Sequence, residues 1–377
     1  MSNDPMDFSK EELARYNRHI ILPEFGLEAQ KKLKGARVLV IGSGGLGSPV
    51  LLYLAAAGVG TIGIVDFDSV DPSNLQRQII FSTDDSGIHK TTAAKNKLQA
   101  LNPHINILTH QTQLKSSNAL EILKNYDIIA DGSDNFPTRY LVNDACVLLG
   151  KPLVYASIYQ FEGQVSVFNL RNANGEHGPN YRDFYPVPPS AGSVPNCAEG
   201  GVLGVLAGII GSLQALEVIK VITGTGETLS GRFYIFDALT FTSHTIKIKS
   251  NPSNPPITQL IDYDEFCSSS PTQDTIKEIT AHDLQFMLQN KEDFQLIDVR
   301  EPEEYNTSNI GGELIPLKTI TANIDKINRN KKVIIHCQTG ARSKQAILEL
   351  QEKFGFTNLY NLEGGCQNLD LGGLNGL

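Results

Sequence analysis

The stretch VLVIGSGGLGSPVLLYLAAAGVG, residues 38–60, decides the fold of the first part of the chain. A short apolar run leads into a glycine-rich turn, and an apolar segment of helical length follows. Glycines let such a turn run tightly and let backbone N–H groups approach a phosphate at the start of a helix. The stretch therefore predicts a strand, a nucleotide-binding turn with Gly42, Gly44 and Gly45, and a helix. Glycines that serve only packing are the alternative.

Further strand-like runs repeat this pattern, at residues 61–68, 105–111, 126–134 and 152–158. Helix-length segments separate these runs, so we predict an α/β fold with a Rossmann-like, doubly wound and mainly parallel sheet. Residues 163–169 and 231–249 alternate in hairpin fashion, which predicts an antiparallel extension of the same sheet.

The composition shifts near residue 250 and indicates a domain boundary. Residues 251–274 are rich in Pro, Ser and Asn, which is typical of a linker. A new cycle of strands and helices begins near residue 275. We therefore predict a first domain over residues 1–250, a linker over 251–274 and a smaller α/β domain over 275–377.

Whole-chain composition restricts the partners. Of 377 residues, 41% are hydrophobic, and the formal net charge of −9 disfavours binding to nucleic acid or anionic membranes. The most apolar run, residues 201–213, is shorter than the roughly 20 residues that span a bilayer and predicts a buried core helix. The polar N-terminus lacks the pattern of a secretory signal, and five cysteines form no paired spacing. We expect a cytoplasmic protein without nucleic-acid or membrane partners.

Polar residues downstream of the turn narrow the nucleotide chemistry. Asp66 closes the next strand, where a carboxylate can bind ribose hydroxyls, but this alone fits NAD as well as ATP. Asn74, Arg77 and Lys90 follow, and Asp134 lies at a strand end. Adenylyl transfer needs cations for the pyrophosphate and a carboxylate for Mg²⁺, whereas a dehydrogenase needs neither. The pattern therefore favours ATP.

The chain resembles the adenylating enzymes that activate ubiquitin-like sulfur carriers in molybdopterin and thiamine biosynthesis, the HesA/MoeB/ThiF family. The resemblance covers roughly residues 10–250 and is carried by motifs in family order. These motifs are RYNRHIIL (15–22), GSGGLGS (42–48), DFDSVDPSNLQRQ (66–78), GIHKTTAAK (87–95), DGSDN (131–135), EGQVSVFN (162–169) and GSLQALEVIK (211–220).

The resemblance implies a set of nucleotide-binding residues. They are Gly42, Gly44, Gly45, Asp66, Ser73, Asn74, Arg77, Lys90, Asp134 and Asn135. Within this set it places Gly45 on the phosphates and Asp66 on the ribose, makes Arg77 catalytic, and assigns Mg²⁺ to Asp134. It also implies a homodimer in which Arg18 reaches into the ATP site of the neighbouring subunit.

Two features of the first domain depart from the family or stay open. Many members bind zinc through two Cys-x-x-Cys pairs, but the corresponding stretches here are NYRD (180–183) and NPSNPPI (251–257). Without these thiolates we predict no structural zinc. Cys197, in VPNCAEGG (194–201), matches a place where family members capture the activated carrier or resolve a disulfide, although a buried structural thiol is the alternative.

The stretch HCQTGARSK, residues 336–344, carries the chemistry of the second domain. A loop between a strand and a helix turns its N–H groups inward, which lowers the pKa of a thiol such as Cys337. Cysteine phosphatases leave five residues between Cys and Arg, whereas four separate Cys337 from Arg342. The tighter ring suits a persulfide, and the domain resembles rhodaneses over about residues 275–370.

Together these features predict a two-step enzyme that uses ATP and Mg²⁺. It would adenylate the C-terminal glycine of a ubiquitin-fold sulfur carrier ending in Gly-Gly and then deliver sulfur from a Cys337 persulfide to form a thiocarboxylate. A cysteine desulfurase or thiosulfate would supply the sulfur, and Cys197 or another thiol would release the product. The alternatives are an adenylyltransferase whose rhodanese domain only docks a donor, and an oxidoreductase fused to a sulfurtransferase.

Overall fold

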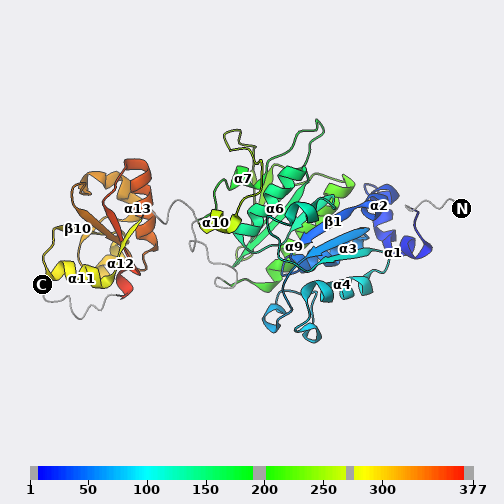
Figure 1. Ribbon diagram of the computed structural model, residues 1–377, viewed down its shortest axis with the longest axis horizontal. Helices are drawn as coiled ribbons and strands as arrows, with labels where there is room; N and C mark the ends of the chain where they lie inside the picture. The colour runs from blue at the N-terminus through cyan, green and yellow to red at the C-terminus, as the bar shows by residue number, and fades with distance from the viewer. Residues whose placement is uncertain (1–6, 190–200, 269–275, 369–377) are drawn as a thin grey trace. The chain divides into compact units, whose positions relative to one another are not determined.

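A computed structural model of the chain describes residues 7–189, 201–268 and 276–368. The chain divides into two compact units, residues 1–268 and 269–377. Figure 1 shows the α/β character of each unit, which we describe in turn.

The first unit is built on an eight-stranded sheet with the order β3-β2-β1-β4-β5-β6-β7-β8. Parallel pairing joins five of its strands. They are β1 (Arg37–Ile41), β2 (Thr61–Val65), β3 (Asn106–His110), β4 (Ile128–Asp131) and β5 (Leu153–Tyr159). Antiparallel pairing adds β6 (Glu162–Phe168), β7 (Arg232–Asp237) and β8 (Thr242–Lys247). The predicted mixed sheet with its antiparallel extension is confirmed.

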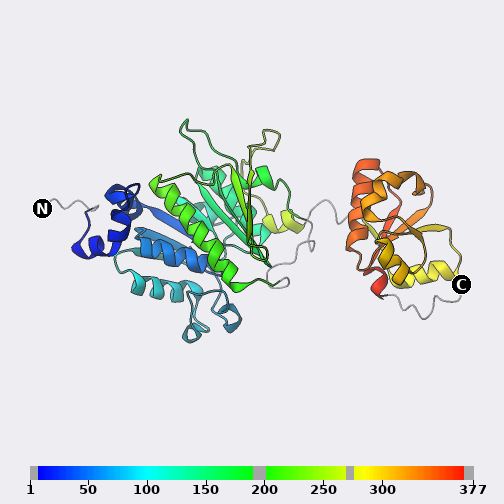
Figure 2. The same cartoon turned by 180° about the vertical axis from the view of Figure 1, so that it is seen from behind.

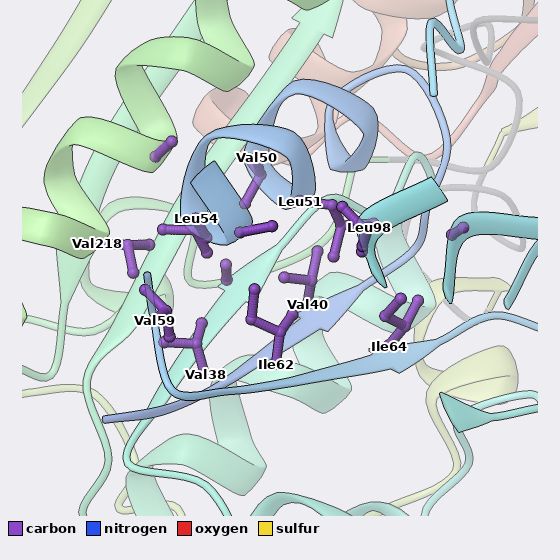
Figure 3. Close-up of a cluster of buried hydrophobic side chains, with 14 of the residues drawn as sticks. Val38, Val40, Val50, Leu51, Leu54, Val59, Ile62, Ile64, Leu98 and Val218 are labelled. Carbon is purple, nitrogen blue, oxygen red and sulfur yellow. The ribbon is translucent and has the colours of Figure 1, made fainter. Parts of the chain in front are cut away.

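Helices cover both faces of this sheet because successive side chains of a strand point to opposite sides. Val38 and Val40 pack towards α3 (Gly47–Ala57), α4 (Lys90–Leu101) and α9 (Gly204–Thr223). Figure 2 shows α3 and α9 side by side on this face, and Figure 3 shows the cluster in detail. Leu39 and Ile41 pack instead towards α5 (Ala119–Leu123) and α6 (Phe136–Leu149). Two short helices, α7 (Tyr181–Phe184) and α10 (Tyr263–Ser268), contribute to that second cluster.

The apolar helix α9 lies in the core, as its sequence predicts. By length and hydropathy it could cross a membrane, yet Gln214 and Glu217 in its middle are buried against the protein. The Gln214 amide donates hydrogen bonds to the carbonyls of Asp131 (2.7 Å) and Val154 (2.9 Å). A side chain on Gly211 would approach Pro49 Cγ to 2.4 Å, so glycine lets α9 pack closely on α3. The helix therefore joins α3 to the sheet.

Residues 251–268, assigned to a linker by composition, belong to the first compact unit. The Tyr263 hydroxyl donates to Asp144 Oδ2 on α6 (2.7 Å), and the Ser116 hydroxyl donates to the Ile261 carbonyl (2.5 Å). Burial of Tyr263 explains this attachment, because an aromatic ring with a satisfied hydroxyl packs well against a helix. The chain leaves the first unit near residue 268.

The second unit contains a five-stranded parallel sheet with the order β11-β10-β12-β13-β9. Its strands are β9 (Lys277–Ile279), β10 (Phe294–Asp298), β11 (Glu313–Leu314), β12 (Lys332–His336) and β13 (Leu359–Leu362). Val333 and Ile335 pack with residues of α13 (Ala341–Phe354), whereas Ile334 faces α11 (Ala281–Gln289) on the other side. A shorter helix, α12 (Pro302–Thr307), follows β10. This arrangement confirms the predicted smaller α/β fold.

Candidate functional sites

A cavity of about 950 Å³ lies in the first unit at the carboxyl ends of β1, β2 and β4. In the sheet, β1 lies between β2 and β4, where the strand order reverses and open α/β sheets bind ligands. Most residues predicted for nucleotide binding line it: Gly42, Gly44, Gly45, Asp66, Arg77, Lys90, Asp134 and Asn135. The structure thus brings together side chains that lie far apart in sequence.

Close backbone contacts shape the glycine-rich turn at the floor of the cavity. Gly42 has a φ of +81°, and its N–H donates to the Val65 carbonyl (2.8 Å). A Cβ on Gly47 would lie 2.0 Å from the Gly42 carbonyl oxygen, so only glycine fits at the start of α3. These contacts tie the turn to β2 and leave the edge at Gly44 and Gly45 open to the cavity.

Asp66 holds the glycine-rich turn in place. Its Oδ2 accepts hydrogen bonds from the Ser43 amide (2.8 Å) and the Ser43 hydroxyl (2.7 Å), and its Oδ1 accepts one from the Asp68 amide (3.0 Å). The side chain is buried but lines the cavity. Asp66 can therefore fix the turn through Oδ2, while Oδ1, which accepts from the Asp68 amide, can accept a further hydrogen bond from a ligand.

Two cations stand beside the turn. Lys90 begins α4, and its Nζ pairs with Asp68 Oδ2 (2.9 Å) while only 7% of its side chain is exposed. Arg77 packs along the turn, because a Cβ on Gly45 would lie 3.6 Å from Arg77 Cγ. Its Nη1 donates to the Ser73 carbonyl (3.2 Å). Such placed cations can neutralise a phosphate chain despite the acidic net charge of the protein.

Several buried oxygens in and next to the cavity have no partner within the described part of the chain. Among the described residues, Asp131 Oδ2, Ser133 Oγ and Gln78 Oε1 are buried and lack a hydrogen-bond partner. Burial raises the pKa of Asp131. Asp134 itself is exposed to the cavity, and Asn135 caps α6 by accepting from the Thr138 amide (3.0 Å). Of Asp131, Ser133 and Gln78, the latter two line the cavity, where a bound ligand or water could supply the missing partner.

Sequence reasoning missed several cavity residues. Arg139 is buried on α6, with its guanidinium 5.8 Å from the centre of the Tyr155 ring. An arginine near the start of a helix that follows DGSDN was the available signal, since the Asp-rich end of β4 pointed to the same place. Asp68 and Gln78 lie within the motif at residues 66–78, but neither was predicted to line the site. Residues 260–264 line the cavity too, and nothing in their composition indicates it.

Three predicted residues with described positions do not line the cavity of their own chain: Arg18, Ser73 and Asn74. Ser73 and Asn74 lie on the 3₁₀ turn Pro72–Asn74, where both bond to Asp71. Arg18 is exposed on α1 (Lys10–Ile20). Their roles in nucleotide binding stay predictions.

The two stretches predicted to stand in place of zinc-binding Cys-x-x-Cys pairs, residues 180–183 and 251–257, are joined by hydrogen bonds. Asp183 Oδ1 accepts from the Asn251 amide (2.9 Å) and from Asn254 Nδ2 (3.1 Å). Asp183 Oδ2 accepts from Asn180 Nδ2 (2.9 Å). We call these four residues, Asn180, Asp183, Asn251 and Asn254, the Asn–Asp clasp. Within each stretch the two clasp residues are three positions apart, which is the spacing of the cysteines in a Cys-x-x-Cys pair. The clasp thus connects the two stretches.

In the second unit, Cys337 follows β12 and lies against the N-terminus of α13. The Gly340 amide donates to Cys337 Sγ (3.1 Å), and the Ser343 hydroxyl lies 3.6 Å from it. Burial opposes ionisation of the thiol, but the Ser343 hydroxyl and the amides of Ser343, Thr339 and Gly340 outweigh it and lower the pKa of Cys337. The loop thus stabilises an anionic sulfur, as its sequence predicts.

Charged residues surround this loop. Arg342 makes a two-pronged ion pair with Glu304 on α12, at 2.7 and 2.6 Å. This pairing lowers the pKa of Glu304 to about 2 and raises the pKa of Arg342, which also lies close to the Cys337 thiolate. Fully buried Arg300 pairs with Asp298 (2.7 Å) and donates to Gln338 Oε1 of the loop (3.1 Å). Arg342, the arginine predicted beside the sulfur, is therefore oriented by the Glu304 carboxylate.

The remaining cysteines have different surroundings. Cys197 lies outside the described residues, so its predicted role stays a prediction. Cys146 is buried in α6, and burial raises its pKa strongly. Cys267 on α10 is half-buried with a pKa raised by burial to about 11. Cys366 lies beside the Cys337 loop.

The first unit has a nucleotide-type cavity on a doubly wound sheet, and the second has a cysteine loop on a parallel sheet of its own. Together these features define a two-domain enzyme of nucleotide and sulfur chemistry. The ThiF family matches residues 16–256, and the rhodanese-like domain matches residues 280–370. The chain belongs to the ThiF family, with a rhodanese-like domain at its C-terminal end.

Curated relatives share this domain pair. A Mycobacterium tuberculosis protein named probable adenylyltransferase/sulfurtransferase MoeZ is 50% identical over 95% of this chain and 92% of its own length. A Drosophila grimshawi adenylyltransferase and sulfurtransferase MOCS3 is 40% identical over 96% of this chain and 85% of its own. A Thermus thermophilus sulfur carrier protein adenylyltransferase is 51% identical and covers 70% of this chain with 99% of its own. These matches show an adenylyltransferase and sulfurtransferase.

Solved structures resemble the first unit. Escherichia coli MccB with MccA-N7isoASN superposes with a TM-score of 0.57 and 25% identity, covering 66% of this chain and 75% of MccB. MccB with ATP gives a TM-score of 0.55 at 24% identity over 64% of this chain and 73% of that chain. Both agree with the doubly wound sheet of the first unit.

Proposed function

We propose that this enzyme adenylates the C-terminal glycine of a ubiquitin-fold sulfur carrier ending in Gly-Gly and converts it to a thiocarboxylate with sulfur from Cys337. The observation that carries the proposal is the pairing, in one chain, of a cavity with cations beside a glycine-rich turn and a cysteine loop with a stabilised thiolate. The names of the relatives supply the substrate class.

The first unit would position ATP and stabilise charge. The turn at Gly44 and Gly45 receives phosphates, Lys90 and Arg77 neutralise the pyrophosphate that leaves, and Asp66 orients the ribose. A carrier carboxylate is already nucleophilic, so the α-phosphorus is attacked without a general base. Catalysis then consists of alignment and electrostatic stabilisation.

The residues at the end of β4 fit a magnesium ion. Mg²⁺ prefers oxygen ligands and is often held by one or two carboxylates together with substrate phosphates. Asp134 lines the cavity and offers such oxygens, and its neighbour Ser133, whose buried Oγ lacks a partner among the residues described, lines the cavity too. Within the described residues there is no cluster of three His, Cys, Asp or Glu side chains that could hold a metal alone. A bound Mg²⁺ would offset negative charge on the phosphates.

The second unit would carry the sulfur. Cys337 accepts sulfane sulfur from a cysteine desulfurase or from thiosulfate, and the Gly340 amide and Ser343 hydroxyl stabilise the anionic product. The terminal sulfur attacks the acyl-adenylate carbonyl and expels AMP. This leaves the carrier bound to Cys337 through a disulfide, which a second thiol cleaves to release the thiocarboxylate.

The proposal includes a homodimer, with Arg18 completing the ATP site of the partner. The exposure of Arg18 on α1, and its absence from the lining of its own cavity, support this role. The need for ATP and for a reduced Cys337 favours the cytoplasm. Carriers of a molybdopterin-type and of a thiamine-type pathway both fit the proposal, and they are separated by which of them gains sulfur.

The test is to incubate the protein with ATP, Mg²⁺, thiosulfate and individual purified carriers of both pathway types, and to weigh each carrier by mass spectrometry. We expect one carrier to exchange one oxygen for one sulfur, which also fixes the pathway. No mass change with any carrier ending in Gly-Gly contradicts the proposal. Adenylation without sulfur incorporation would support a docking role for the rhodanese domain, and an unchanged yield in Cys337→Ala would do the same.

A further inference from the structure

The release step of the proposed reaction needs a thiol near Cys337, and the second unit has one. It contains two cysteines, Cys337 and Cys366. The Cys366 amide donates to the Cys337 carbonyl (2.9 Å), although the two residues lie far apart in sequence. The two thiols therefore flank the same loop.

The backbone approach is close enough for a disulfide. With a 2.9 Å hydrogen bond between Cys366 N and Cys337 O, standard bond lengths limit the distance between the two Cα atoms to about 6.8 Å. Disulfides form at Cα separations of about 4.4–6.8 Å. Gly365 makes this approach feasible, because a Cβ there would lie 2.4 Å from the Cys337 carbonyl oxygen.

The Cys366 side chain already contacts the loop. Its Sγ lies 3.6 Å from Gln338 Oε1, which in turn accepts from Arg300 Nη1 (3.1 Å). Cys337 is 1% exposed, whereas Cys366 is half-buried and keeps part of its surface open to solvent.

We propose that Cys366 is the resolving thiol that releases the product from Cys337, an inference that rests on the proposed function. The Cys366 sulfur attacks Cys337 Sγ of the acyl disulfide and loses its proton. The bond between Cys337 Sγ and the transferred sulfur breaks, and its electron pair leaves with the carrier thiocarboxylate. A Cys337–Cys366 disulfide results, and an external dithiol reductant returns both residues to thiols.

The chemistry favours this direction of attack. A thiol–disulfide exchange is faster when the leaving sulfur is the weaker base, and a thiocarboxylate is a weaker base than an alkyl thiolate. Attack at Cys337 Sγ therefore expels the better leaving group. Cys366 acts only after AMP has left, so the proposal gives it no role in the ATP-dependent half-reaction.

The test compares the full-length protein with Cys366→Ser, Cys197→Ser and the control Cys267→Ser, in a single turnover without reductant. Each is given thiosulfate, ATP, Mg²⁺ and the carrier that accepts sulfur. AMP formation and sulfur on Cys337 are measured in the same samples. The products are separated under non-reducing conditions and mapped by peptide mass spectrometry.

We expect the unchanged protein and Cys267→Ser to release thiocarboxylate and to form a Cys337–Cys366 disulfide in equal amounts. Cys366→Ser should retain the carrier on Cys337, release it at least tenfold more slowly, and recover when dithiothreitol is added. Release by Cys366→Ser at the normal rate, loss of its sulfur loading, or a disulfide between Cys337 and Cys197 overturns the inference. Absence of AMP or of sulfur on Cys337 in the unchanged protein overturns the proposed function itself.

Discussion

The glycine-rich turn of the first unit and the cysteine loop of the second both connect a parallel strand to the start of a helix, yet they present different groups. In the first, the Ser43 amide is used internally by Asp66, and the cavity offers the side chains of Lys90 and Arg77. In the second, the Gly340 amide itself points at the sulfur. A turn between a strand and a helix can thus place charged side chains around a cavity or direct a main-chain amide at a single atom.

The size of the proposed ligand would account for the difference. In the proposed function a triphosphate needs charges placed at several positions, which side chains from α4 and the 66–78 segment would supply. A single sulfur atom is small enough to be surrounded by the amides of one loop. The comparison predicts that the two sites fail independently, and that different kinds of substitution weaken them.

The largest effect is expected for Asp134→Asn, which replaces the proposed Mg²⁺-binding carboxylate in the cavity of the first unit with a neutral amide. Adenylation, measured as the exchange of labelled pyrophosphate into ATP, should become slower by about 100-fold or more. Sulfur transfer from thiosulfate to cyanide at Cys337 should be unchanged. Loss of both activities in a folded variant would contradict the independence of the two sites.

A somewhat smaller loss is expected for Lys90→Ala. The buried ammonium lies beside the turn, and its removal should slow pyrophosphate exchange by about 100-fold, the lower end of the effect of removing one charge-stabilising group. Lys95→Ala on the same helix is the matched control, since Lys95 does not line the cavity. Equal losses in both variants would indicate a general electrostatic effect instead of a placed cation.

For the cysteine loop, Ser343→Ala should raise the pKa of Cys337, because the hydroxyl that stabilises its thiolate is lost. The thiolate fraction at a given pH falls, so the midpoint of a pH profile of alkylation by iodoacetamide moves to higher pH. A midpoint that is higher by about one pH unit corresponds to alkylation about tenfold slower on the rising part of the profile. Thr339→Val is the control, since it keeps the amide that faces the sulfur, and an equal change there would sink the assignment.

The smallest effect on activity is expected for Asp183→Ala in the Asn–Asp clasp. Several hydrogen bonds are lost at a half-buried site, so the first unit should be destabilised by about 1–2 kcal/mol. That corresponds to a decrease of roughly 2–8 °C in the midpoint temperature at which the first unit unfolds. Asp84→Ala, an exposed carboxylate, serves as the control. An unchanged transition would mean that the clasp does not hold its two segments together.

Local patterns predicted much of the molecule. The alternation of Val38, Leu39, Val40 and Ile41 between two helix-covered faces follows from a strand buried on both sides, and the glycines of the turn mark where the backbone approaches β2 and β4. The Cys337 loop was predictable for the same reason, since all its groups are neighbours in sequence.

Contacts over long sequence distances were harder to predict. Arg139 looks like an ordinary helix cation until the packing of α6 buries it against Tyr155. Residues 260–264 lie between two stretches rich in Pro and Ser, but Tyr263 reaches Asp144 and fixes them at the cavity wall. Cys366 had no assignable partner in sequence because β13 and the turn after it determine its distance from Cys337.

The hydrogen bonds between Ser43 and Asp66 have a consequence for the kinetics of nucleotide binding. Because they form within the folded protein, the turn is ordered before any ligand arrives, and association does not bear the entropy of closing it. The Ser43 amide should then exchange its hydrogen slowly in the free enzyme and change little when ATP is added. Nucleotide affinity would be limited by how the side-chain ends of Arg77 and Lys90 are placed instead of by the backbone.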